Sequence, residues 1–131
     1  MHIVRNILST VALVVIAAAC GWSATFAIRW LRAEPALQAG DFSAIVASAG
    51  RPVVLFATTT CPYCGKARDL LDALKVQHVV YDIDVSESAR ALYARLHANS
   101  VPVLVTTDLR ITGFDEARYR STLAPLVPHS P

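Results

Sequence analysis

Two cysteines, Cys61 and Cys64, are the residues whose type and spacing point most directly to chemistry. Pro62, between them, suits the first position of a helix, because proline has no N–H to leave unpaired there. Cys61 would then lie beside free backbone N–H groups and the positive end of the helix dipole, which both favour a thiolate. Cys64 would lie one turn further on, where it can attack a mixed disulfide on Cys61. The spacing predicts a working dithiol.

Three other uses of a cysteine pair are less consistent with this sequence. A structural disulfide between Cys61 and Cys64 would close a very small ring and remove little entropy from the unfolded chain. A zinc site needs a second pair of ligands, and the only other cysteine, Cys20, lies in a distant apolar segment. Two buried, inert cysteines would not explain the proline and the helix start. Redox chemistry without a metal is therefore favoured.

A strand must lead into this dithiol and a helix must follow it. Residues 52–57 are β-branched and aromatic, as in a buried strand, and residues 62–75 repeat apolar side chains at helical spacing. The other predicted elements are a short helix at 41–49, a strand at 79–85, a helix after Ser86, strands at 101–105 and 110–112, and a last helix after Asp115. This order predicts an α/β sandwich with a right-handed crossover and a terminal hairpin.

Three motifs in order resemble the glutaredoxin family of the thioredoxin superfamily. They are Cys61-Pro62-Tyr63-Cys64 between a strand and a helix, Ser100-Val101-Pro102 before a strand, and Thr112-Gly113-Phe114-Asp115-Glu116 before the last helix. The resemblance covers residues 52–123 and implies a thioredoxin-like three-layer sandwich around a central mixed four-stranded sheet. It also implies that Cys61 is the attacking nucleophile and Cys64 the resolving thiol.

The same resemblance implies a substrate site beside the cysteines. Pro102 would form a cis peptide bond, leaving the backbone of Val101 free for a substrate peptide or glutathione. Asp115, with Glu116, falls where the family holds the γ-glutamyl amine of glutathione. The predicted site is completed by Thr58, Pro62, Tyr63, Gly113 and Phe114.

Three features depart from the family pattern. Glutaredoxins commonly carry a lysine three residues before the first cysteine, where this chain has Thr58. The Gly113-Phe114-Asp115 segment is also similar to the glutaredoxin-like electron donors that thioredoxin systems reduce. The helix at 41–49 is an element found in thioredoxins and usually absent from small glutaredoxins. The sequence therefore indicates the reaction class more firmly than the reductant.

The predicted function is that of a thiol–disulfide oxidoreductase linked to glutathione or to a thioredoxin system, with glutathione as the expected co-substrate and no bound cofactor. Its partners would be a disulfide-bonded protein or a glutathione mixed disulfide. One alternative is an exported disulfide oxidant or isomerase module that a membrane partner recharges. The other is a non-catalytic module that senses redox state or carries a metal.

The first 33 residues read as a membrane anchor. No charged residue lies between Arg5 and Arg29, and residues 7–28 are apolar or small. As a helix they would reach about 33 Å, against a hydrocarbon core of about 30 Å. A cleaved secretory signal and a lipoprotein signal with lipid on Cys20 are the alternatives. Residues 34–50 are predicted as a linker and short helix, 51–127 as the glutaredoxin-like domain, and 128–131 as a tail.

Charge separates the two parts of the chain. From residue 41 onward there are nine Lys or Arg and nine Asp or Glu, so the net charge of +2 belongs to the anchor. A neutral domain without a basic cluster gives no ground for nucleic-acid binding. Residues 6–28 predict a single-pass protein, assigned to a bacterial inner membrane. An early apolar segment after a short basic start favours a periplasmic domain over a cytoplasmic one.

Overall fold

The computed structural model describes Ile7, Val11 and residues 36–128. Its elements are β1 (Leu37–Ala39), α2 (Ser43–Ala49), β2 (Val53–Ala57), α3 (Pro62–Ala73), β3 (His78–Asp82), α4 (Glu87–Ala94), β4 (Val103–Val105), β5 (Leu109–Thr112), α5 (Glu116–Leu123) and a short 3-10 helix, η1 (Ala124–Leu126). The predicted order of strands and helices from the strand before the cysteines to the last helix is confirmed.

The sheet is mixed and has five strands, in the order β1-β5-β4-β2-β3. Only β2 and β3 run parallel, and the other neighbours are antiparallel. The prediction of four strands was wrong, because β1 lies in the segment 34–50 that was read as a linker and short helix. Its three residues are all exposed, so no apolar alternation marks them. The strand is held through its backbone, with Leu37 opposite Ile111.

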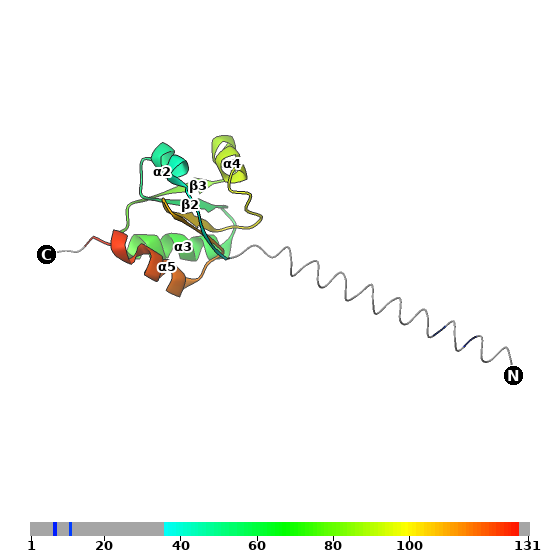
Figure 1. Ribbon diagram of the computed structural model, residues 1–131. Coiled ribbons are helices and arrows are strands. Elements are labelled where there is room, and N and C mark those ends of the chain that lie inside the picture. The colour runs from blue at the N-terminus through cyan, green and yellow to red at the C-terminus, as the bar shows by residue number, and fades with distance from the viewer. Residues whose placement is uncertain (1–6, 8–10, 12–35, 129–131) are drawn as a thin grey trace. The chain divides into compact units, whose positions relative to one another are not determined.

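The helices cover both faces of this sheet, which confirms the three-layer sandwich. Figure 1 shows α3 and α5 on one face, and α2 and α4 on the other. Two apolar clusters correspond to these faces. One joins Leu55 to Leu71 and Tyr119, and the other joins Phe56 to Ile45. All five residues of β2 are completely buried, as suits the strand that leads into Cys61.

Local signals explain where the helices begin and end. The side chains of Ser86 and Asp115 cap α4 and α5, accepting N–H groups at 3.3 and 3.1 Å. Gly50 ends α2 in the left-handed region, at φ 65°. The strand predicted at 79–85 is shorter, because the N–H of Ser86 bonds the carbonyl of Asp82 and closes a turn. Val85, the last residue of the predicted strand, lies beyond β3 and is 74% exposed.

The predicted anchor and tail lie largely outside the described residues. Of the segment 6–28, only Ile7 and Val11 are described, and of the tail only its first residue. Within the part of the chain that the structure describes, none of the helices has both the length and the apolar character needed to cross a bilayer.

Candidate active site

The dithiol lies where β2 hands over to α3. Cys61 is the N-cap residue of α3, with an extended backbone, and Pro62 occupies the first helical position. The carbonyl of Cys61 accepts the N–H groups of Cys64 and Gly65 at 3.1 and 3.2 Å, which fixes the first turn. Cys61 is partly exposed, whereas Cys64 is buried in the apolar cluster beneath α3. Only one of the two sulfurs is therefore open to a large substrate.

Hydrogen bonds hold the pKa of the Cys61 thiol below its ordinary value. The thiol of Cys64 is the largest contributor, partial desolvation acts in the opposite direction, and the backbone N–H groups of Cys64 and Tyr63 add to the lowering. Both N–H groups belong to the first turn of α3. The N–H of Cys64 also bonds the Cys61 carbonyl, whereas the helix offers no carbonyl to the N–H of Tyr63. The helix start therefore stabilises a thiolate on the exposed sulfur.

Burial does the reverse to the second cysteine and raises the pKa of Cys64 to about 11. Hydrogen bonds from the backbone and hydroxyl of Thr58 oppose this rise, while the hydrogen bond and charge of Cys61 add to it. Burial also raises the pKa of Tyr119, as does the charge of a Cys64 thiolate. Tyr119 is therefore a buried, neutral neighbour of the inner sulfur.

The Val101–Pro102 peptide bond is cis, as the sequence predicted. The carbonyl of Pro102 accepts the N–H of Gly113 at 2.8 Å, which ties this segment to the start of α5. Among the described residues, no backbone group bonds the N–H or carbonyl of Val101. Val101 packs against the same apolar cluster as Cys61.

The segment before α5 is held by its own helix. Tyr119 donates its hydroxyl to the carbonyl of Gly113 at 3.1 Å, and its ring meets that of Phe114 edge-on at 5.3 Å. Asp115 caps the helix and pairs with Arg118 at 3.3 Å. Glu116 pairs with Arg120 at 2.8 Å. Both carboxylates are exposed and already carry an arginine partner.

An open groove of about 390 Å³ runs between α3 and the start of α5. Its lining residues are Lys66, Asp69, Leu70, Phe114 and Glu116. The ammonium of Lys66 lies 5.3 Å from the centre of the Tyr63 ring, and Tyr63 is 58% exposed. Lys66 lies within the first two turns of α3, at the end of the helix that carries both cysteines.

The glutaredoxin family profile matches residues 53–111 of this chain. A glutaredoxin from Ricinus communis is 32% identical over 80 residues, which are 58% of this chain and 78% of that protein. The chain belongs to the glutaredoxin family. As a glutaredoxin it is a thiol–disulfide oxidoreductase, and its two cysteines lie close together, consistent with a CxxC active site.

Solved structures agree with this glutaredoxin's fold. It is similar to the dithiolic glutaredoxin 2-C-Grx1 of Trypanosoma brucei brucei, with a TM-score of 0.51, 27% identity, and coverage of 63% of this chain and 95% of that one. A buckwheat glutaredoxin–glutathione complex matches with a TM-score of 0.51 and 23% identity, covering 65% and 84% of the two chains. The second likeness supports the fold alone.

Three residues of this glutaredoxin's site were missed by the sequence prediction. Lys66 lies in the predicted helix at 62–75 and Tyr119 in the predicted last helix, and neither was predicted as a site residue. Asp84 binds the loop before Cys61, through Thr59 at 2.9 and 2.5 Å. Asp84 and Thr59 are 25 residues apart, and no local pattern connects them. Only the parallel pairing of β2 with β3 brings them together.

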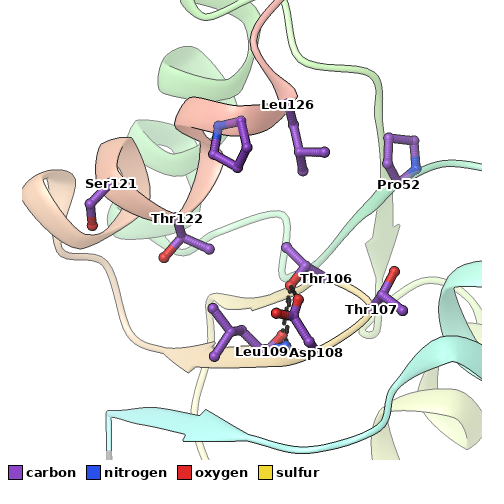
Figure 2. Close-up of a pocket in the computed structure, with 9 residues that line it drawn as sticks. Pro52, Thr106, Thr107, Asp108, Leu109, Ser121, Thr122 and Leu126 are labelled. Atoms are coloured by element: carbon purple, nitrogen blue, oxygen red, sulfur yellow. Dashed lines mark hydrogen bonds between the residues drawn. The ribbon is translucent and has the colours of Figure 1, made fainter.

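A second hollow, of about 300 Å³, lies at the other end of this glutaredoxin's sheet, between the β4–β5 turn and the α5–η1 segment (Figure 2). Its labelled lining residues are Pro52, Thr106, Thr107, Asp108, Leu109, Ser121, Thr122 and Leu126. Pro52 precedes β2, whereas Cys61 follows the opposite end of that strand. None of the predicted site residues lines this hollow, so it is separate from the dithiol.

Proposed function

We propose that this glutaredoxin reduces disulfides by a dithiol cycle. The Cys61 thiolate attacks one sulfur of the substrate disulfide, and the other sulfur leaves as a thiolate and takes a proton. Cys64 then attacks the Cys61 sulfur, releases the second substrate thiol and forms the Cys61–Cys64 disulfide. Two electrons pass to the substrate, and a thiol reductant returns them in the next half of the cycle.

The observation that carries this proposal is the asymmetry of the two sulfurs. Cys61 is partly exposed and its pKa is lowered, whereas Cys64 is buried with a pKa raised to about 11. The thiolate is the nucleophile in thiol–disulfide exchange, so the first attack falls to Cys61. Burial keeps a large substrate away from Cys64, which suits a resolving thiol that acts only within the chain.

The mixed disulfide itself would help Cys64 to react. Two of the causes that raise the pKa of Cys64 are the hydrogen bond and the negative charge of Cys61. Both depend on a free Cys61 thiolate, and both disappear once Cys61 is bonded to substrate. The donors of Thr58 still lower the pKa of Cys64 at that stage. Deprotonation of the resolving thiol therefore becomes easier when it is needed.

Glutathione is the proposed co-substrate, with its charged ends beside the dithiol. The buckwheat relative was solved as a glutathione complex. In this chain the unpaired backbone of Val101 can bond an extended peptide, and Asp115 with Glu116 can meet an ammonium group. Thr58 supplies no cation for a carboxylate, but Lys66 lines the groove beside Tyr63 and supplies one. Lys66 thus offers a substitute for the missing lysine.

A thioredoxin-type reductant remains the second candidate. The observation that favours it is the Gly113-Phe114 segment, in which the Phe114 ring packs on Tyr119 and lines the groove. An apolar ring at this place suits a protein surface better than a small, charged tripeptide. A third candidate, a membrane partner that recharges an exported oxidant, would use the same Cys61 face.

Turnover of a glutathione mixed disulfide by reduced glutathione tests the proposed function. Cys61→Ser should abolish turnover, because the exposed thiolate of the dithiol is lost. Cys64→Ser should keep activity that needs only one cysteine, yet lose the reduction of protein disulfides. Cys20→Ser is the matched control and should leave both activities intact. Turnover by the Cys61→Ser protein would overturn the assignment of the nucleophile.

We also propose that residues 6–28 anchor the protein in a membrane, with the domain on the periplasmic side of a bacterial inner membrane. Its support is the sequence alone: an uncharged, apolar run between Arg5 and Arg29 that is long enough to span. Labelling of Cys61 in intact cells with a membrane-impermeant thiol reagent tests the side. Labelling only after the cells are broken open would place the domain in the cytoplasm.

A further inference from the structure

The loop that presents the nucleophile is tied to a distant turn. Residues 58–60 join the buried strand β2 to Cys61. The backbone N–H and the hydroxyl of Thr59 both donate to the same carboxylate oxygen of Asp84, at 2.9 and 2.5 Å. Two donors on one ionised acceptor make a short, charge-assisted clamp. The clamp acts two residues before Cys61.

The acceptor stands on a turn that is itself fixed. Before it, the N–H of Ile83 bonds the carbonyl of Ala57 at 2.9 Å and extends the β2–β3 pairing. After it, the N–H of Ser86 bonds the carbonyl of Asp82 at 3.0 Å, and Ser86 caps α4. Arg90 also bonds the carbonyl of Ile83 at 3.0 Å. Asp84 is therefore a rigid reference point for the loop.

The hydrogen bonds of Thr59 and the nearby Arg68 favour the ionised form of the Asp84 carboxyl. The hydrogen bonds of Thr59 hold its pKa below the ordinary value, and the Arg68 guanidinium adds a smaller effect. Arg68, which projects from α3, is ion-paired with Asp82 at the end of β3. Asp82 is therefore already matched by a cation, and the Asp84 carboxylate is engaged by the loop.

We propose that Asp84 is a positioning residue for the nucleophile: through Thr59 it fixes the loop that places Cys61 at the start of α3. The thiolate of Cys61 is stabilised by the Cys64 thiol and by N–H groups of the first helical turn, and these hydrogen bonds require the Cys61 sulfur to point at their donors. A loosened loop weakens these hydrogen bonds. The inference rests on the proposed role of Cys61, but it concerns how that thiolate is formed.

The loss of a nearby charge and the loosening of the loop change the pKa of Cys61 in opposite directions, so the two effects can be told apart. Removing a negative charge near a thiolate lowers its pKa, because the repulsion is lost. Loosening the loop raises the pKa of Cys61, because its hydrogen bonds are lost. Asp84→Asn removes the charge and weakens the clamp, so positioning predicts a rise. Glu87→Gln removes a charge three residues away, has no contact with Thr59 and serves as the matched control.

The experiment is the alkylation rate of Cys61 in the full-length reduced protein as a function of pH, followed at that residue by peptide mass spectrometry. Asp84→Asn and Thr59→Val should each shift the midpoint of the pH–rate curve upward, by about half to one pH unit for Asp84→Asn, which slows alkylation about threefold to tenfold at any pH below the wild-type midpoint. Thr59→Ser should restore the wild-type rate, and Glu87→Gln should not slow it.

An unchanged or faster reaction of Asp84→Asn would overturn the inference. So would a slowing by Glu87→Gln equal to that by Asp84→Asn. Thermal unfolding of each variant shows that the fold is intact, and Thr59→Val keeps the test open should Asp84→Asn fail to fold. Because alkylation reads the thiolate directly, a failure here is distinct from a failure of the dithiol cycle, which Cys61→Ser turnover reports.

Discussion

At the scale of single residues, the two cysteines differ by position and not by chemistry. Cys61 is the N-cap residue of α3, and hydrogen bonds from the Cys64 thiol and from the N–H groups of Cys64 and Tyr63 lower its pKa. Cys64 is one turn further along and buried, so its pKa rises to about 11. The sequence predicted the lowering on Cys61, because Pro62 marks the helix start. It could not predict the rise on Cys64, which depends on burial by residues from other elements.

Substitution of Thr58 tests how much the use of glutathione depends on a cation three residues before Cys61. Thr58→Lys should raise the use of glutathione by about threefold to thirtyfold, because a charge-assisted hydrogen bond to a carboxylate replaces at most a neutral one. It should also lower the pKa of Cys61. Steady-state rates with a glutathione mixed disulfide measure the first effect. Thr107→Lys, an exposed threonine on the β4–β5 turn, controls for added charge.

An unchanged glutathione rate for Thr58→Lys, together with good activity with a thioredoxin-type reductant, would contradict glutathione as the physiological partner.

Substitution of Lys66 tests whether this residue supplies the cation that Thr58 does not. Lys66→Gln should raise KM for a glutathione mixed disulfide by about threefold to tenfold, since a partly exposed charge-assisted contact is worth about 1 kcal/mol. kcat should change little, because Lys66 contacts Tyr63 and not the sulfurs. Lys75→Gln, beyond the other end of α3, is the matched control. Equal KM values for the two variants would remove Lys66 from the glutathione site.

At the scale of elements, helices and strands with a clear capping residue or apolar pattern could be predicted from the sequence, and those without one could not. The helix after Ser86 and the one after Asp115 carry capping side chains, and both caps are present. Strand β1 has three exposed residues and no pattern, and only its partner β5 defines it. Val85 continued the alternation of β3 but lies past the turn, because backbone hydrogen bonds outweighed the burial of one side chain.

Asp115 allows capping of α5 to be separated from ligand binding. Asp115→Asn keeps an oxygen for the N–H of Arg118, and asparagine caps helices as well as aspartate. Asp115→Ala loses the cap, at about 1 kcal/mol, which lowers Tm by about 4–8 °C in a domain of this size. Asp115→Asn should therefore keep Tm close to wild type. Asp115→Asn should still raise KM for glutathione, because the ammonium of the γ-glutamyl group loses the Asp115 carboxylate as its partner.

Thermal unfolding and glutathione kinetics on the same two variants check this prediction. A wild-type KM for Asp115→Asn would show that Asp115 is a helix cap and not a glutathione ligand.

At the scale of the whole molecule, the fold and family follow from three motifs, whereas the placement in the cell rests on residues 6–28. The motifs could be recognised in the sequence because each combines fixed residue types with a strand or helix boundary. The reductant could not be predicted from the sequence, because it depends on the groove between α3 and α5, whose lining comes from separate parts of the chain. The hydrogen bonds from Thr59 to Asp84 could not be predicted for the same reason, because the two residues are far apart in the chain.

The anchor predicts how the full-length protein fractionates. Alkaline carbonate washing of membranes should leave it in the pellet, because a spanning helix is held by burial of its apolar side chains and not by charge. Intact mass should show an uncleaved N-terminus. A soluble species that begins after residue 19 or 27 would establish a cleaved signal instead, and a lipid on Cys20 would establish a lipoprotein.

The order of attack by the two sulfurs is the central claim, and trapping tests it most directly. Reduced Cys64→Ser and Cys61→Ser proteins are mixed with oxidised glutathione near neutral pH, quenched with acid and mapped by mass spectrometry. We expect a stable glutathione adduct on Cys61 in the first variant and none at Cys64 in the second on the same timescale, because Cys64 is buried and burial, the largest cause of its raised pKa, persists without Cys61. Rapid adduct formation on Cys64 in the Cys61→Ser protein would contradict it.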